Sequence, residues 1–132
     1  MKTLVIVTAL IKYKDKYLIA KRAPEKRFSP NQWEFISGFI EEKEPAEETI
    51  IREIKEETYL KGKIVATSSP FTLNDSEARW IVVSYLVSVE PYAIKLNPED
   101  HSEYCWATRK ELAKYRDLHP YIDGFKEVKL LS

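Results

Sequence analysis

This sequence has one cysteine, no net charge and no long apolar run, and each of these features excludes a class of protein. Cys105 is the single cysteine, so the chain forms no intramolecular disulfide. Together with the two histidines, His101 and His119, it supplies too few ligands for a structural zinc site. A chain without disulfides suits a reducing compartment, and we expect a cytoplasmic protein.

The charges balance, since 21 Lys and Arg are matched by 21 Asp and Glu. A net charge of zero provides no basic field to hold polymeric nucleic acid, so no such partner is expected. The apolar run at 3–11 falls short of the about 18 residues that a membrane span needs. No small-residue cleavage site follows it, and we expect neither a signal peptide nor a membrane partner.

The sequence does contain apolar material for one domain. Its 132 residues are 44% hydrophobic and 12% aromatic, which supports a single packed domain over residues 1–132. Runs rich in β-branched and aromatic residues predict strands at 3–11, 17–21, 33–36, 63–73, 79–89 and 103–107. A polar turn at 74–76 separates two of these runs, which we expect to pair as a hairpin.

Three helices are predicted from spacing and capping signals. An apolar residue recurs every four positions over 46–54, after a proline suited to the first helical position, so we expect a helix over 45–60. A capping box at Thr108 and Glu111 predicts a second helix, and Pro120 the start of a third. Strands, a helix, further strands and then helices make an α+β domain with a mixed sheet.

Three acidic side chains share one edge of the apolar face of the first helix. At about 100° per residue, Glu57 falls inside the apolar stripe, and Glu53 and Glu56 follow further round. Carboxylates about 5 Å apart repel by roughly 3 kcal/mol at an effective dielectric of about 20, so a positive charge must offset them. Arg52 points about 100° away from this edge and is better placed to hold Glu48 or Glu56. Mg²⁺ or Mn²⁺, hard cations that take oxygen ligands, meet the requirement.

A Glu-rich helix in a chain that is 32% charged is in most cases only a solvated face. The wider spacing argues against that interpretation here. Gly38, Glu44 and Arg52 precede the three acids at fixed offsets, an arrangement that arises by chance on the order of once in 10⁵.

The segment Gly38 to Leu60 resembles the Nudix box, which runs Gly, five residues, Glu, seven residues, Arg-Glu, an aliphatic, any residue, Glu-Glu, any residue, Gly, aliphatic. The residues match except that Tyr59 replaces the final Gly. Segments 19–22, 33–35 and 104–112 are similar to the strands and the helix start of MutT-type members. The likeness therefore spans most of the chain, although only the box is specific.

The resemblance implies an α/β/α sandwich with a mixed sheet and a loop-helix-loop metal site. It implies Mg²⁺, or alternatively Mn²⁺, held by the carboxylates of Glu53, Glu56 and Glu57. A backbone carbonyl at Ser37 or Gly38 completes the ligand set.

The resemblance also implies catalytic roles within the box. Glu53 is the candidate base for the attacking water, since a carboxylate that touches a metal-bound water is well sited for it. Some family members recruit an acid from a loop instead, and the alternatives here are Asp75, Glu77, Asp100 and Glu103. Arg52 is expected to orient the site by pairing with Glu44 or Glu56.

Cations and one aromatic ring near the box are the candidates for substrate binding. Arg22 and Arg27 would place positive charge against phosphates. Phe35 is either a platform for a nucleotide base or a core residue. We expect His101 and His119 to lie in loops without a chemical role.

The activity that the resemblance implies is hydrolysis of a nucleoside diphosphate linked to another group. The short, MutT-like chain favours nucleoside triphosphates, damaged ones included, which release a monophosphate and pyrophosphate. ADP-ribose, sugar nucleotides and dinucleoside polyphosphates are the alternative substrates. The missing Gly leaves a second interpretation open, a catalytically weak domain that binds a nucleotide to regulate another process. A monomer and a homodimer both fit the sequence.

Tyr59 also bears on where the helix ends. In the family, the Gly at this position takes a left-handed turn directly after the acids, a conformation that Tyr tolerates poorly. We therefore expect the helix to continue to Leu60 or Lys61 and to end at Gly62.

Overall fold

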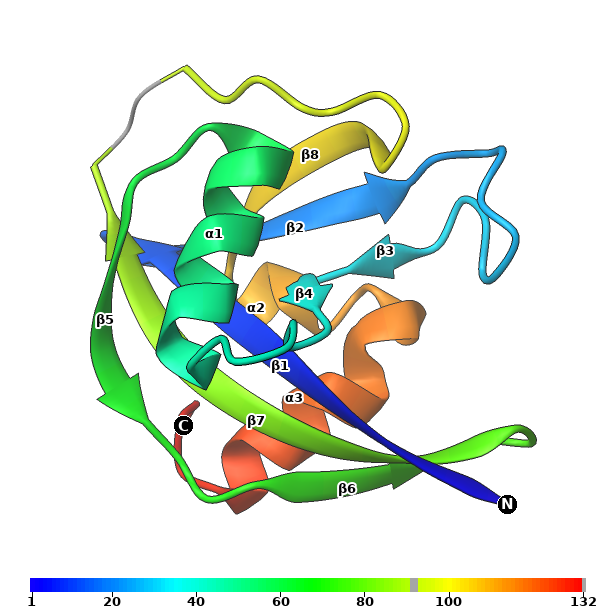
Figure 1. Ribbon diagram of the computed structural model, residues 1–132. Helices are drawn as coiled ribbons and strands as arrows, with labels where there is room; N and C mark the ends of the chain where they lie inside the picture. The colour runs from blue at the N-terminus through cyan, green and yellow to red at the C-terminus, as the bar shows by residue number, and fades with distance from the viewer. Residues whose placement is uncertain (91–92, 132) are drawn as a thin grey trace.

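Eight strands form one mixed sheet with helices on both faces (Figure 1), in a computed structural model that describes residues 1–90 and 93–131. The strands are β1 Lys2–Tyr13, β2 Lys16–Arg22, β3 Trp33–Glu34, β4 Ile36–Gly38, β5 Gly62–Thr67, β6 Phe71–Asn74, β7 Ala78–Val89 and β8 His101–Thr108. The helices are α1 Ala46–Thr58, α2 Arg109–Leu112 and α3 His119–Glu127, with a 3₁₀ turn at Arg116–Leu118. The expected α/β/α sandwich is confirmed.

β1 and β7 form the centre of the sheet as a parallel pair, in register from Lys2 opposite Ala78 to Lys12 opposite Ser88. The central order is β3-β2-β1-β7-β5, with β4 beside β1, β6 beside β7 and β8 beside β2. These other pairs are antiparallel. β5 and β6 both pair with β7, as the predicted hairpin requires. They are separate strands because Pro70 has no N–H to donate to the ladder.

Two cores lie on opposite faces of the sheet, because side chains alternate along each strand. Ala9 of β1 packs beneath α1 with Ile50 and Ile54. Leu10, the next residue, faces the other side and packs with Phe125 of α3. The apolar stripe predicted for the first helix is therefore the face that α1 buries against the sheet.

α1 ends before Tyr59, and the prediction that the helix continues as far as Gly62 is wrong. Tyr59 is left-handed, with φ 64° and ψ 9°, and its N–H donates to the carbonyl of Lys55 at 2.9 Å. Leu60 gives the reason, because its side chain is fully buried in the core beneath α1. On a continued helix Leu60 would point about 120° away from Ile54. Burying Leu60 gains about 2 kcal/mol, which offsets the roughly 1–2 kcal/mol of left-handed strain.

The other helix signals are mostly confirmed. Thr108 and Glu111 form the capping box at α2, with bonds of 3.2 and 2.9 Å. α3 begins at His119 with Pro120 in its first turn. Pro45 is the N-cap of α1 and lies just outside its first turn, one residue earlier than expected.

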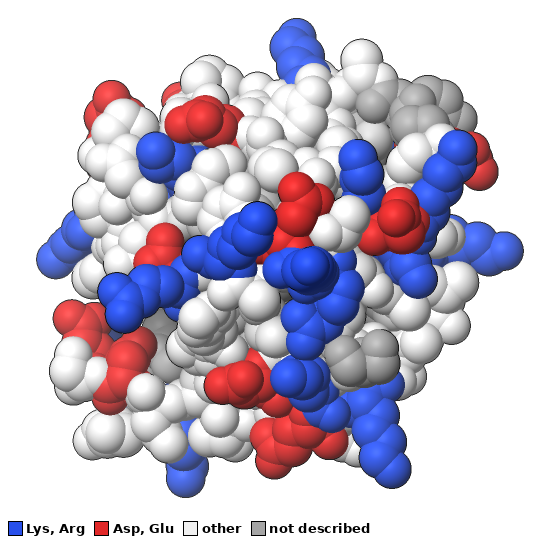
Figure 2. All heavy atoms as spheres, turned by 180° about the vertical axis from the view of Figure 1, so that it is seen from behind, with Lys and Arg blue, Asp and Glu red and all other residues white. Residues whose placement is uncertain are grey.

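Acidic and basic side chains are interleaved on the face opposite to that of Figure 1, as Figure 2 shows. This interleaving agrees with the net charge of zero. Over residues 1–90 and 93–131, the helices are too short or too polar for any of them to cross a bilayer.

Candidate active site

A pocket of about 740 Å³ opens beside α1 and brings the box residues together. Glu53, Glu56 and Glu57 line it from α1, and Ser37 and Gly38 line it from β4. The five residues predicted to form the metal site therefore border a single pocket. They come from two elements that the loop at 39–45 connects.

Arg52 is the centre of the ion pairs that hold these acids. Its Nε and Nη2 donate to both oxygens of Glu44 at 2.8 and 3.0 Å, and its Nη1 donates to Glu53 at 3.0 Å and to Glu56 at 3.2 Å. The Arg52 guanidinium, together with the Thr49 hydroxyl, lowers the pKa of Glu44 to about 2. The pairings with Glu44 and Glu56 are as expected. The prediction that Arg52 points away from the acid edge is wrong, since Arg52 donates to Glu53. The long side chain of Arg52 reaches round the helix to make this bond.

Gly38 lies directly against the side chain of Glu53. A Cβ at this position would be 2.5 Å from Cδ of Glu53, so only a hydrogen fits there. The preceding residue is held as well, since the hydroxyls of Ser37 and Thr8 lie 2.9 Å apart. The absence of a side chain at Gly38 thus lets the β4 backbone and the Glu53 carboxylate share the same wall of the pocket.

Glu57 is the buried acid of the site, with a side chain that is 10% exposed. Within the described part of the chain its Oε2 has no hydrogen-bond partner. Burial, and the neighbouring carboxyl of Glu53, raise the pKa of Glu57. A buried carboxyl oxygen without a partner is unfavourable by itself, and a bound cation would remove the penalty.

The residues fit a divalent ion that shares its ligands with a substrate. No three Asp, Glu, His or Cys side chains within 1–90 and 93–131 converge closely enough to hold a metal alone. Mg²⁺ commonly binds through one or two carboxylates and completes its shell with waters and substrate phosphates. Glu53 and Glu57 supply two such carboxylates, whereas Glu56 is 58% exposed at the rim.

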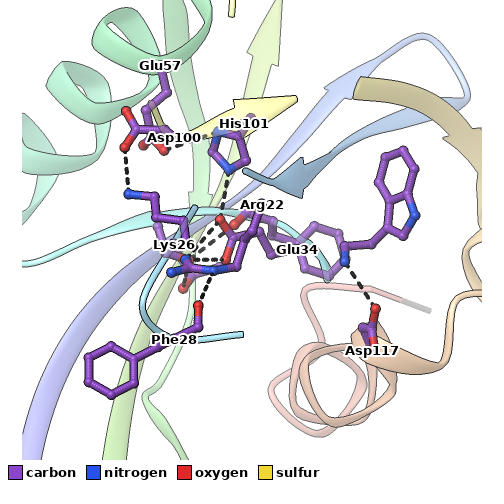
Figure 3. A network of polar contacts seen from close by, with 12 residues as sticks. Arg22, Lys26, Phe28, Glu34, Glu57, Asp100, His101 and Asp117 are labelled. Atoms are coloured by element: carbon purple, nitrogen blue, oxygen red, sulfur yellow. Dashed lines mark hydrogen bonds and ion pairs between the residues drawn. The ribbon is translucent and has the colours of Figure 1, made fainter. Parts of the chain in front are cut away.

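His101 and Glu34 form a second wall of the pocket, which the sequence analysis missed. His101 is 1% exposed, and its Nε2 lies 2.7 Å from Oε2 of Glu34, while its Nδ1 lies 3.6 Å from Oε1 of Glu57. Figure 3 shows the imidazole between the two carboxylates. The prediction that His101 lies in a loop is wrong, because His101 begins β8. A local signal existed, since Glu34 is an acid between Trp33 and Phe35.

His119 is also misplaced by the sequence analysis. It begins α3, and its Nε2 lies 2.7 Å from the carbonyl of Ala113. The contact ties the start of α3 to the end of α2, so His119 has a structural partner outside the pocket.

The predicted substrate-binding cations differ in where they lie. Arg22 lines the pocket, and its Nη1 donates to Glu34 at 3.2 Å. The guanidinium of Arg27 lies over the ring of Phe28 at 5.3 Å, and Arg27 does not line the pocket. Lys26, the residue before Arg27, does line the pocket. Its Nζ pairs with the carboxylate of Asp100 at 2.9 Å (Figure 3).

Phe35 belongs to the core. It borders the pocket, but it is only 2% exposed, and its ring packs edge-on against Phe125 at 5.1 Å. Because the Phe35 ring is almost fully buried, it has no free face on which a nucleotide base could stack. Of the two interpretations of Phe35, the substrate-binding one is therefore wrong.

Asp100 is the only one of the four alternative bases that lines the pocket. Asp75 accepts the backbone N–H groups of Glu77 and Ala78 and so fixes the turn between β6 and β7. Glu103 pairs with Lys21 at 3.4 Å on the surface. Asp100 thus remains beside Glu53 as a candidate base.

Comparison with known proteins agrees with this site. Residues 2–127 match the NUDIX domain family. The chain is 30% identical to the nucleoside triphosphatase NudI of Escherichia coli (strain SE11) and to that of Shigella sonnei (strain Ss046), over 87% of this chain and 89% of each relative. The crystal structure of a MutT protein from Methanosarcina mazei Go1 has a similar fold, with a TM-score of 0.85 at 22% identity over 97% of this chain and 94% of that one. The NUDIX domain of Shewanella oneidensis NrtR, solved with ADP ribose, has a TM-score of 0.73 at 20% identity over 99% and 90%. With its box acids gathered in one pocket on this fold, the chain belongs to the Nudix family and is a hydrolase that acts on phosphoric anhydride bonds.

Proposed function

We propose that this hydrolase is a Mg²⁺-dependent pyrophosphohydrolase that cleaves nucleoside triphosphates, damaged ones included, to a monophosphate and pyrophosphate. The observation that carries the proposal is the buried, unpartnered Oε2 of Glu57 beside Glu53. Two acids so placed need a cation, and a cation so placed attracts a polyphosphate. The relatives named nucleoside triphosphatases support the substrate class.

The metal would be held by Glu53 and Glu57, with Glu56 at the rim and a backbone carbonyl of Ser37 or Gly38. Mg²⁺ and Mn²⁺ both prefer such oxygen ligands. Bound there, the ion supplies Lewis-acid polarisation of the substrate's phosphoryl oxygens.

Glu53 is the base that we assign to the attacking water. Its carboxylate faces the pocket, and Arg52 fixes its orientation through a bond of 3.0 Å. Arg52 is itself anchored by both oxygens of Glu44, so hydrogen bonds connect the three side chains. Asp100 is the competing base, and a comparison of Glu53→Gln with Asp100→Asn in a pH–rate profile separates them.

Arg22 and Lys26 are the cations that we assign to the substrate phosphates. Each is engaged in the structure, Arg22 with Glu34 at 3.2 Å and Lys26 with Asp100 at 2.9 Å. A phosphate that enters the pocket can replace these carboxylates as the acceptor. The planar fork of Arg22 suits two phosphate oxygens at once.

A panel assay tests the proposal. The protein is incubated with Mg²⁺ and with nucleoside triphosphates, oxidised nucleoside triphosphates, ADP-ribose, sugar nucleotides and dinucleoside polyphosphates. We expect turnover of the triphosphates, and a loss of about hundredfold or more in Glu57→Gln, since removing even an outer partner of a metal ligand costs 10–100-fold. Glu48→Gln is the matched control, because Glu48 is an exposed acid of α1 that lies outside this pocket.

The outcome that contradicts the proposal is tight nucleotide binding without turnover for any member of the panel. That result would favour the alternative interpretation, a nucleotide-binding domain with weak catalysis. Turnover of ADP-ribose in place of the triphosphates would retain the metal site but change the substrate. The structural relative solved with ADP ribose is the reason for including that compound.

A further inference from the structure

Tyr59 holds a strained backbone conformation directly beside the metal-site acids. Its φ of 64° lies in the left-handed region, which a bulky residue adopts rarely and at a penalty. Five other non-glycine residues within 1–90 and 93–131 also have positive φ, namely Lys14, Ser29, Asn31, Lys43 and Lys129. None of those five lines the pocket, whereas Tyr59 does.

The Tyr59 ring extends into solvent at the mouth of this pocket. The residue is 59% exposed, so its ring is not needed to fill the core. It lines the pocket together with Glu56 and Glu57, the acids that precede it by three and two residues. Because the burial of Leu60 accounts for the left-handed backbone, it is the exposed ring at the pocket, and not the strain, that points to a role in binding.

Lys95 holds this ring from a different segment of the chain. Its Nζ lies 5.5 Å from the centroid of the Tyr59 ring, which is cation–π distance. Its backbone N–H donates to the carbonyl of Thr58 at 3.1 Å, so the loop is fastened to the end of α1. The two contacts fix Lys95 at the helix terminus and restrict where the ring can turn.

We propose that Tyr59 is a specificity-determining residue whose ring stacks on the base of the nucleotide substrate, with Lys95 as the positioning residue for that ring. The inference rests on the proposed function, since it assigns a binding partner to the same site. The acids and cations of the pocket can hold phosphates and a metal, but a planar base needs an aromatic face. Phe35 is buried and cannot supply one. Tyr59 supplies it close to the acids.

The test compares two substitutions that both remove the ring but differ in backbone strain. Tyr59→Gly relieves the left-handed strain, whereas Tyr59→Ala keeps it. We expect both variants to raise KM for a nucleoside triphosphate by about tenfold, the change for one lost stacked base, with kcat retained. Their melting temperatures should differ, with Tyr59→Gly the more stable. Tyr59→Phe should keep the wild-type KM, and Lys95→Met should raise it about threefold, as for one lost cation–π contact.

Product inhibition shows which part of the nucleotide the ring touches. In Tyr59→Ala the inhibition constant for the nucleoside monophosphate should rise about tenfold, while that for inorganic pyrophosphate stays unchanged. Tyr104→Ala is the control for the loss of an exposed aromatic, since Tyr104 is 44% exposed on β8 and outside the pocket. Phe39→Ala tests the competing ring, because Phe39 lines the pocket, is 54% exposed and packs against Trp80.

Three results would overturn the inference. One is a wild-type KM in both Tyr59→Gly and Tyr59→Ala. Another is a raised KM in Tyr59→Ala but not in Tyr59→Gly, which would mean that backbone strain, and not loss of the ring, changes KM. The third is a tenfold rise in Phe39→Ala with none in the Tyr59 variants. A wild-type protein without turnover would overturn the proposed function, whereas the three results above, in a protein that does turn over, overturn this inference alone.

Discussion

Gly38→Ala should disable the active site without unfolding the protein. A Cβ at position 38 would lie 2.5 Å from both Cγ and Cδ of Glu53 and 2.7 Å from its Oε1. Non-bonded carbon atoms settle about 3.5 Å apart, so the Glu53 carboxylate must retreat by about 1 Å. The retreat moves it away from the β4 backbone and strains its 3.0 Å bond to Arg52.

The expected magnitudes for activity and stability differ. A displacement of about 1 Å in a reacting group lowers kcat by about a hundredfold. The atoms that must move are the end of a flexible side chain bordering the pocket, and replacing Gly by Ala at a compatible backbone position stabilises by about 0.4–1 kcal/mol. We therefore expect the free energy of unfolding to stay within about 1 kcal/mol of wild type.

The assay pairs steady-state kinetics in Mg²⁺ with thermal unfolding. Gly62→Ala is the matched control, because its Cβ would lie 2.6 Å from Cγ1 of Val87 in the core. That variant should lose about 1–3 kcal/mol of stability and keep the kcat of its folded fraction. A Gly38→Ala protein with wild-type kcat, or one whose activity falls only as far as it unfolds, would refute the reasoning.

Three further substitutions test the ion pairs and the core. Glu44→Gln should be less stable than wild type above pH 4.5, and in melts the difference should vanish as the pH falls from 4.5 to about 2, because protonation of Glu44 then weakens the same pairing with Arg52. His101→Ala should lose about 1–3 kcal/mol in urea unfolding, because the Glu34 carboxylate loses its 2.7 Å partner; an unchanged midpoint would contradict this contact. Phe125→Ala should lose about 3–5 kcal/mol, because its ring is fully buried, and a smaller loss would mean that the core beside α3 collapses around the gap.

The sequence determined those parts of the site that depend on near neighbours along the chain. The positions of Glu53 and Glu57 on the burying edge of α1 follow from the helical period, which needs no knowledge of the sheet. The pairing of Arg52 with Glu56 follows from the same period. The capping box at α2 is also local, because its donor and acceptor lie three residues apart.

Tertiary structure alone decided the remaining parts. The contact of His101 with Glu34 joins residues 67 positions apart, and it depends on the pairing of β2 with β3 and β8, including a register irregularity at Arg22. The left-handed turn at Tyr59 depends on the core that Leu60 must enter. Secondary-structure propensity depends on a residue and its neighbours along the chain. Burial and strand register depend also on distant residues that folding brings close. The placement of Glu53 and Glu57 along the pocket was therefore predictable from the sequence, whereas the contact of His101 with Glu34 was not.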